Sequence, residues 1–160
     1  MKTVIGTNIV ATDRWLEEIR RGRAFSSGGS IGPIAGNYSQ HQILNPAGSG
    51  VNALLHQIDA NSSGNDSPDL RTYNTALTTL IRQGANLLIG GTAALCAHRV
   101  NTDPLQSGTQ VSNYFLAANV PRLLVGHWYA ELGPGEGLVL GANTPNLVMY
   151  GNFMWIEIPL

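Results

Sequence analysis

The fold is decided by Leu147-Val148-Met149-Tyr150-Gly151-Asn152-Phe153-Met154-Trp155-Ile156-Glu157-Ile158. Successive side chains of a strand point to opposite faces, and here both alternating sets are largely apolar. Both faces of this strand are therefore expected to be covered. One face would meet the core of a sandwich, and the other would meet either an N-terminal helix or a neighbouring copy of the protein. Pro159 then ends the strand, because proline cannot donate to a ladder.

Upstream of this strand, short apolar or alternating runs recur from Asn37 onward, and each is bounded by Gly, Pro or Asn. Such spacing predicts a mainly β domain over residues 38–160, an antiparallel β-sandwich of jelly-roll-like type. The polar stretch 59–69 is expected to be an exposed loop, and residues 73–82 fit either a short helix across the sandwich or an irregular strand. The predicted strands are residues 38–44, 51–58, 86–89, 94–100, 110–116, 122–132, 138–141 and 147–158.

The N-terminal region, residues 1–37, is expected to form a short helix followed by an extended arm. The helix pattern runs from an N-cap at Thr12 or Asp13 to a stop at Gly22. Residues 24–37 are rich in glycine and serine, which is typical of a flexible or extended linker.

A narrow apolar stripe on this helix, together with the arginines at its end, is the predicted partner-binding site. The helix is too short to be stable alone, so it should dock either on its own domain or on a neighbouring subunit. The arginines would pair with carboxylates of a neighbour or complement the helix C-terminus. The predicted residues are Trp15, Leu16, Ile19, Arg20, Arg21 and Arg23.

Composition limits the classes of function. The 160 residues suit one domain, and only 12% are charged, against roughly 25% in an average soluble domain. The formal charge of -1 gives no long-range field for a phosphate backbone, so nucleic-acid binding is not expected. No apolar run approaches the roughly 20 residues of a membrane span, so no membrane association is expected. The single cysteine, Cys96, cannot form an internal disulfide and is expected to be buried.

No pattern of catalytic or ligand-binding residues is evident. His41, His56, His98 and His127 lack the spacing of a local metal pair, so each is expected at the surface or an edge, and no metal or cofactor is predicted. The Gly-x-Ser-x-Gly spacing at residues 28–32 lies in the predicted linker and not in the strand-turn-helix context that a nucleophile elbow requires. We therefore expect no catalytic residues and no enzyme activity.

Two further groups of residues were considered as sites. Glu131 and Glu136, the close acidic pair of the C-terminal half, flank a Gly-Pro-Gly turn that should expose both to water. Trp128 and Tyr129 could form a sugar platform, but neighbouring strand residues point to opposite faces, so at least one of the two should be core.

Three motifs resemble those of small tailed-bacteriophage virion proteins. Residues 36–51 are similar to their polar opening strand with its Asn-Pro-x-Gly-Ser-Gly turn. Residues 132–140 are similar to their proline-glycine turn before a late strand, and residues 146–159 to their closing strand with a Trp-x-Glu ending.

The resemblance implies a β-sandwich structural subunit, often trimeric, located in the virion and assembled in the host cytoplasm. Its partners would be other virion proteins, such as the major capsid protein or tail and collar proteins. We expect a capsid decoration or cement protein that stabilises the particle. The alternative is a head or tail fibre module that binds a host receptor through loops such as 61–69 and 101–109.

Overall fold

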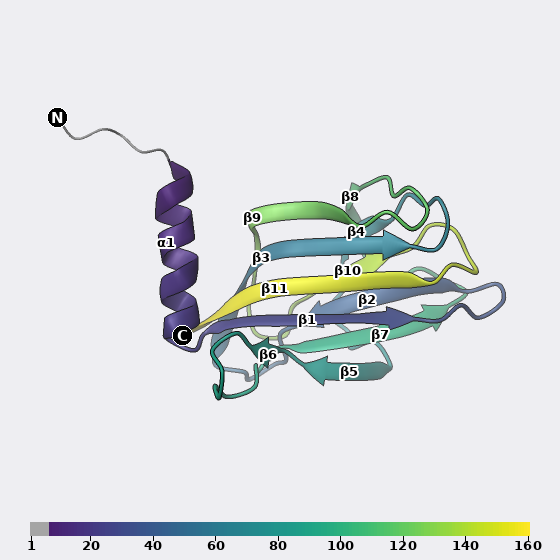
Figure 1. The fold of residues 1–160 in the computed structure, drawn as a ribbon. Coiled ribbons are helices and arrows are strands. Elements are labelled where there is room, and N and C mark those ends of the chain that lie inside the picture. Colours follow the sequence, from purple (N-terminus) through teal and green to yellow (C-terminus); the bar gives the residue numbers. More distant parts are fainter. Residues whose placement is uncertain (1–6) are drawn as a thin grey trace.

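The chain folds as two antiparallel β-sheets packed face to face, with one helix projecting from an end (Figure 1). The structure, a computed structural model, describes residues 7–160, with their side chains from Arg14 onward apart from Arg82, His127 and Trp128. This architecture confirms the predicted mainly β class and its antiparallel sheets. No helix in the described range is long and apolar enough to cross a membrane.

Within residues 7–160 the two sheets have five and six strands. The five-stranded sheet has the order β6-β1-β11-β3-β9, and the six-stranded sheet has the order β5-β7-β2-β10-β4-β8. The elements are α1 (Thr7–Arg20), β1 (Ala24–Ile31), β2 (Tyr38–Leu44), β3 (Val51–Ser62), β4 (Asp69–Thr72), β5 (Thr79–Gln83), β6 (Ala85–Asn86), β7 (Ala97–Asp103), β8 (Thr109–Asn113), β9 (Arg122–Leu132), β10 (Gly137–Gly141) and β11 (Met149–Pro159).

Strand β11 lies between β1 and β3 and supplies the largest core side chains. Phe153 and Trp155 point into the space between the sheets and are fully buried. On the opposite face Ile156 is also fully buried, whereas Tyr150 is 48% exposed. The prediction that both faces are covered is therefore confirmed for the half of β11 near α1, whereas at Tyr150 the chain itself leaves the outer face open.

The predicted glycine- and serine-rich arm is wrong for residues 24–31, which form β1. This strand pairs with β11 along its whole length, from Ala24 opposite Ile156 to Ile31 opposite Met149. The expected domain boundary at residue 37 thus falls in the turn between β1 and β2, inside the sandwich. Only residues 32–37 of the predicted arm stay outside a strand.

Glycine is needed at one β11 position for a packing reason. A Cβ on Gly151 would lie 2.9 Å from Cγ of His41, which is buried beneath it. Glycine at this position therefore reflects close approach between the sheets rather than flexibility.

Helix α1 begins at Thr7, earlier than the predicted N-cap at Thr12 or Asp13. Its end is as predicted: Gly22 has a φ of 68°, and its N–H donates to the Ile19 carbonyl at 2.9 Å. The Arg23 N–H donates to the Glu18 carbonyl at 2.9 Å. Together these two bonds form a Schellman motif, which fixes the angle at which the helix leaves the sandwich.

Two uncertain segments are now placed. Residues 79–83 form β5 with a register shift between Leu80 and Arg82, so the irregular-strand alternative is confirmed for the end of the predicted stretch. Residues 73–78 lie in neither a helix nor a strand. The stretch 59–69 is not simply an exposed loop, because residues 59–62 continue β3 and Asp66 is buried. The Asp66 carboxylate accepts from the Asn143 and Thr144 N–H groups and so fixes this segment to the loop after β10.

Candidate functional site

The end of the sandwich that carries α1, here called the basal end, gathers segments that are far apart in the sequence (Figure 1). Two turns meet there: the Asn45 N–H donates to the Glu136 carbonyl at 2.9 Å, and the Gly135 N–H donates to the Asn45 carbonyl at 2.8 Å. The Leu160 N–H donates to the Gly50 carbonyl, which places the C-terminus beside them. The segments 36–51 and 132–140 are therefore in direct contact.

A bulge in β3 provides the docking point for α1. Against β11, His56 is one extra residue between Leu55 and Gln57. Against β9 the same step faces three residues, 127–129, so the pairing is irregular on both sides of β3, and His56 points outward together with Gln57. The Trp15 ring stacks on the His56 ring, with centroids 4.3 Å apart and planes 16° apart. Trp15 thus attaches the helix to its own domain, which is one of the two predicted modes of docking.

The arginines at the end of the helix pair within the chain. Glu18 is buried, and its carboxylate accepts from Nε of Arg23 at 2.7 Å and lies 2.5 Å from Nη2 of the same residue. Arg21 pairs with the exposed Glu17 one turn earlier. Within the chain, both arginines therefore have a carboxylate partner on α1 itself.

Of the remaining predicted partner-binding residues, Leu16 and Arg20 are exposed and Ile19 is half-buried. Partner binding by this helix stays a prediction. Leu16, Arg20 and Arg21 are the exposed members of the predicted set.

Glu157 anchors the loop between β6 and β7 to the basal end. Its buried carboxylate accepts from the Cys96 N–H at 2.8 Å, the Leu95 N–H at 3.0 Å and Trp155 Nε1 at 3.2 Å. Burial, and then the Glu157 charge beside it, raise the pKa of the Cys96 thiol. Cys96 is therefore an unreactive thiol in the core, as the sequence predicts.

Apolar side chains are exposed around this anchored loop. A cavity of about 320 Å³ lies between the loop, the start of β1 and the end of β11. We call the exposed apolar residues of this end the basal surface, and they are Leu16, Leu88, Ile89, Leu95 and Leu160. Exposed apolar side chains gathered in one region are typical of a surface that binds another protein.

The histidines differ from the prediction, because His41 and His98 are fully buried between the sheets. His41 Nδ1 lies 3.0 Å from His98 Nε2, His41 Nε2 lies 3.0 Å from the Met149 carbonyl oxygen, and His98 Nδ1 lies 3.1 Å from Ser27 Oγ. The carbonyl can only accept, so His41 donates from Nε2 and accepts from His98, which in turn accepts from the Ser27 hydroxyl.

This chain of hydrogen bonds satisfies two neutral imidazoles. Burial lowers the pKa of His41 to about 4, against the smaller opposite effect of its hydrogen bond to Met149. Ser27 and His98 have the residue types of a nucleophile and base, but both are sealed from solvent. The pair therefore holds the core together and has no path to a substrate.

The other residues considered for chemistry behave largely as expected. Glu131 and Glu136 are exposed, accept hydrogen bonds from Asn52 and the Gly133 N–H respectively, and line a cavity of about 440 Å³ with Tyr129. Tyr129 packs against the core, while the side chains of His127 and Trp128 lie outside the described residues. Among the described residues no group of His, Cys, Asp or Glu could hold a metal ion.

Comparison with known proteins adds no relative to this description. No protein-family model, curated protein or solved structure matches the chain.

Proposed function

We propose that the chain is a structural protein of a bacteriophage virion, a capsid decoration or cement subunit that attaches through its basal end. The observation that carries the proposal is the order of the strands. Strands β5, β6 and β7 can be treated as an insertion between β4 and β8. Without them, one sheet has the order β1-β11-β3-β9 and the other has the order β2-β10-β4-β8. First and last strands are neighbours, and consecutive strands alternate between the sheets except at β4 and β8.

This order supports the finer fold prediction, a jelly roll. Jelly rolls are common in viral capsid proteins, although lectins and cupins share the architecture. Because the architecture alone does not define the function, the basal surface is the second observation that supports the proposed virion role. A subunit that buries its surface in an assembly needs exposed apolar side chains before it assembles, and Leu16, Ile89 and Leu160 are such residues.

The proposal extends to the remaining predictions. The partners are other virion proteins, of the major capsid or of the tail and collar, and further copies of this chain, with a trimer implied by the resemblance. The chain acts in the particle, without nucleic acid or membrane contact and without catalysis. The low charge supports this role, because charged residues are depleted at the cores of protein interfaces.

The location is tested on particles of the phage that encodes the chain. Density-gradient-purified virions should contain it in a fixed ratio to the major capsid protein, measured by quantitative mass spectrometry. Detection in the lysate with none in the purified particles would refute the virion role.

The attachment mode is tested with a matched pair of substitutions. Leu16→Glu places a charge on the basal surface, whereas Leu105→Glu places one on an exposed loop between β7 and β8. We expect Leu16→Glu to reduce binding to particles that lack the protein at least tenfold, and Leu105→Glu to bind normally. Equal binding by both variants would argue against the basal end as the contact.

The alternative function is a receptor-binding module on a fibre. One observation favours it, a recess on the outer face of the five-stranded sheet that an exposed tyrosine, Tyr150, lines beside Asp59 and Asn152.

A further inference from the structure

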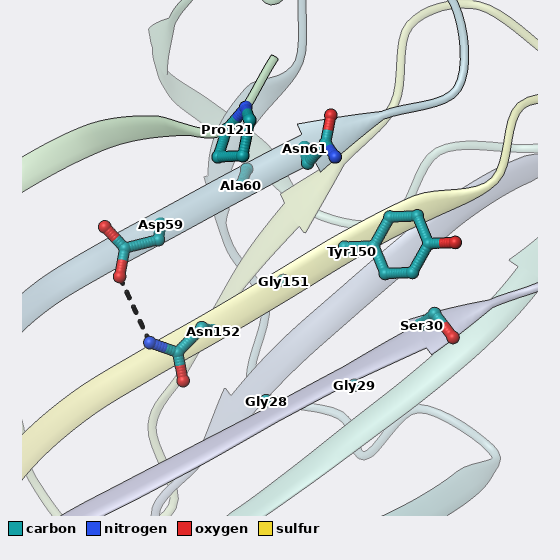
Figure 2. A pocket seen from close by; sticks show the side chains of 10 residues that line it. All are labelled: Gly28, Gly29, Ser30, Asp59, Ala60, Asn61, Pro121, Tyr150, Gly151 and Asn152. Carbon is teal, nitrogen blue, oxygen red and sulfur yellow. Dashed lines mark hydrogen bonds between the residues drawn. The ribbon is translucent and has the colours of Figure 1, made fainter. Parts of the chain in front are cut away.

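A recess of about 470 Å³ lies on the outer face of β1, β11 and β3, further along these strands from α1 (Figure 2). Pairing in the sheet fixes its residues in two rows. Tyr150 lies between Ser30 and Asn61 in one row, and Asn152 lies between Gly28 and Asp59 in the next. Its volume falls within the roughly 300–1,000 Å³ of small-molecule sites.

The recess is hollow because Gly28 has no side chain where its neighbours do. A Cβ on Gly28 would lie 3.1 Å from Oδ1 of Asn152, so even an alanine would crowd this amide. Pro121, which precedes β9, borders the recess beyond β3.

The polar groups of the recess are held in place. Asp59 accepts from Nδ2 of Asn152 at 3.1 Å (Figure 2). It also accepts from Nε2 of Gln57, at 2.8 and 3.0 Å. A carboxylate offers about four acceptor positions, so one remains for a ligand. Oδ1 of Asn61 is buried and makes no hydrogen bond within the described residues, so a ligand hydroxyl reaches this acceptor only if the amide turns toward the recess.

We propose that this recess binds a neutral saccharide, with a sugar ring packed on Tyr150 and its hydroxyls bonded to Asp59, Asn61 and Asn152. The C–H face of a pyranose packs on an aromatic ring, and Tyr150 is 48% exposed. Sugar hydroxyls both donate and accept, which suits a carboxylate placed beside two amides.

Other ligand classes fit less well. The ten described residues that line the recess include one carboxylate and no cationic side chain, which disfavours phosphates and acidic sugars. Arg122 lies next to Pro121 but donates to the Phe115 carbonyl at 2.5 Å. A wholly apolar ligand would cover the Asp59 carboxylate without replacing its water, which is costly.

The test uses the full chain and saturation-transfer difference NMR with the methyl glycosides of glucose, galactose, mannose and N-acetylglucosamine. At least one should receive saturation at its ring C–H protons and shift the amide resonances of Gly28 and Gly151 in the unmodified protein. Tyr150→Ala should abolish the transfer and Tyr150→Phe should retain it. Phe115→Ala removes an exposed aromatic outside the recess and should have no effect.

Three outcomes would overturn the inference: no transfer to any of the four glycosides, equal transfer with Tyr150→Ala, or tighter binding of methyl α-sialoside than of the neutral sugars. The amide shifts come from the unmodified protein, so the test survives a variant that fails to fold. The recess is separate from the basal surface, so failure here leaves the proposed virion role standing, and loss of that role leaves the recess to be tested.

Discussion

The same three strands, β1, β11 and β3, carry two different surfaces. At the basal end the outer face of the sheet is covered: Ile156 is buried, and α1 is attached by Trp15 stacking on His56. Further along, the outer face is open, and Tyr150 with Asn152 surrounds a recess. Alternation alone cannot distinguish the two halves, because both have the same period. The difference arises because α1, which is distant in the sequence, is attached over the basal half of these strands and not over the other half.

The interior differs in the same way. Beneath the covered half the core is aromatic, with Phe25 and Trp155 6.0 Å apart between ring centroids. Beneath the open half it is polar, with His41 and His98 bonded to each other under Gly151. Each half therefore depends on a different kind of interaction, and the predictions below separate them.

The largest effect is expected from Glu157→Ala at the basal end. Removing the carboxylate leaves the buried N–H groups of Leu95, Cys96 and Trp155 without an acceptor, which should lower the free energy of unfolding by about 3 kcal/mol. Urea denaturation measures this loss. The control Glu131→Ala removes an exposed carboxylate and should cost less than about 0.5 kcal/mol. Equal costs for the two variants would mean that the anchored loop adds nothing to stability.

An effect of similar size, dependent on pH, is expected beneath the recess. The pKa of His41 is about 4 in the folded protein and 6.5 as its ordinary value, so the unfolded chain binds more protons between these values. This contribution to stability is complete above pH 6.5 and falls by roughly 3 kcal/mol as the pH is lowered to 4.

The measurement for this prediction is urea denaturation at several pH values in that window. His41→Gln should flatten the pH dependence, whereas His56→Gln at the basal end should leave its slope nearly unchanged. If His41→Gln leaves the slope of unfolding free energy against pH unchanged, groups other than His41 cause the pH dependence.

The next largest effect is expected on the docking of α1 to the sandwich. Trp15→Ala removes the stacking on His56 and should weaken docking of α1 by about 1 kcal/mol, or about fivefold in the docking equilibrium. Hydrogen exchange of the α1 amides reports this change while the strands keep their protection. His56→Ala should act similarly, and the double variant should cost less than the sum of the two. Strict additivity would show that the rings do not interact.

The smallest effect is expected from the exposed ion pair of α1. Arg21→Ala breaks the pair with Glu17 at the surface and should change the free energy of unfolding by at most about 0.5 kcal/mol. Arg23→Ala should cost more, because its partner Glu18 is buried and would keep an unpaired charge. Thermal unfolding at low and high salt compares the two, and a larger loss for Arg21→Ala would reverse this assignment.

Sequence patterns predict the structure correctly where residues close in the chain determine it. The apolar run over residues 147–158 predicts β11, and Gly22 predicts the end of α1, because both depend on residues close in the chain. Residues 24–31 were misread because the space around their glycines is occupied by side chains from elsewhere. A Cβ on Gly29, for example, would lie 2.6 Å from Cδ1 of Ile81. The composition shows that these glycines lack a Cβ, but it does not show which side chains from other strands occupy the space beside them.

The positions of the candidate site residues also depend on contacts between segments far apart in the sequence. His41 and His98 are 57 residues apart, and neither spacing nor burial propensity indicates that pairing of β2 with β7 brings them together. Tyr150 was assigned to a covered face because its neighbours are apolar. Its exposure is decided by where α1 stops covering the sheet, which is a property of the assembled fold rather than of the strand.

The position of the C-terminus has a practical consequence for peptide display. Leu160 lies at the base of α1, so a peptide fused after it would emerge into the contact that we propose for attachment (Figure 1). The turn over residues 32–37 joins β1 to β2 at the opposite end, where a Cβ on Gly32 or Gly36 would meet no atom within 4 Å. A foreign epitope carried on a particle by this protein therefore belongs in that turn, not at the end of the chain.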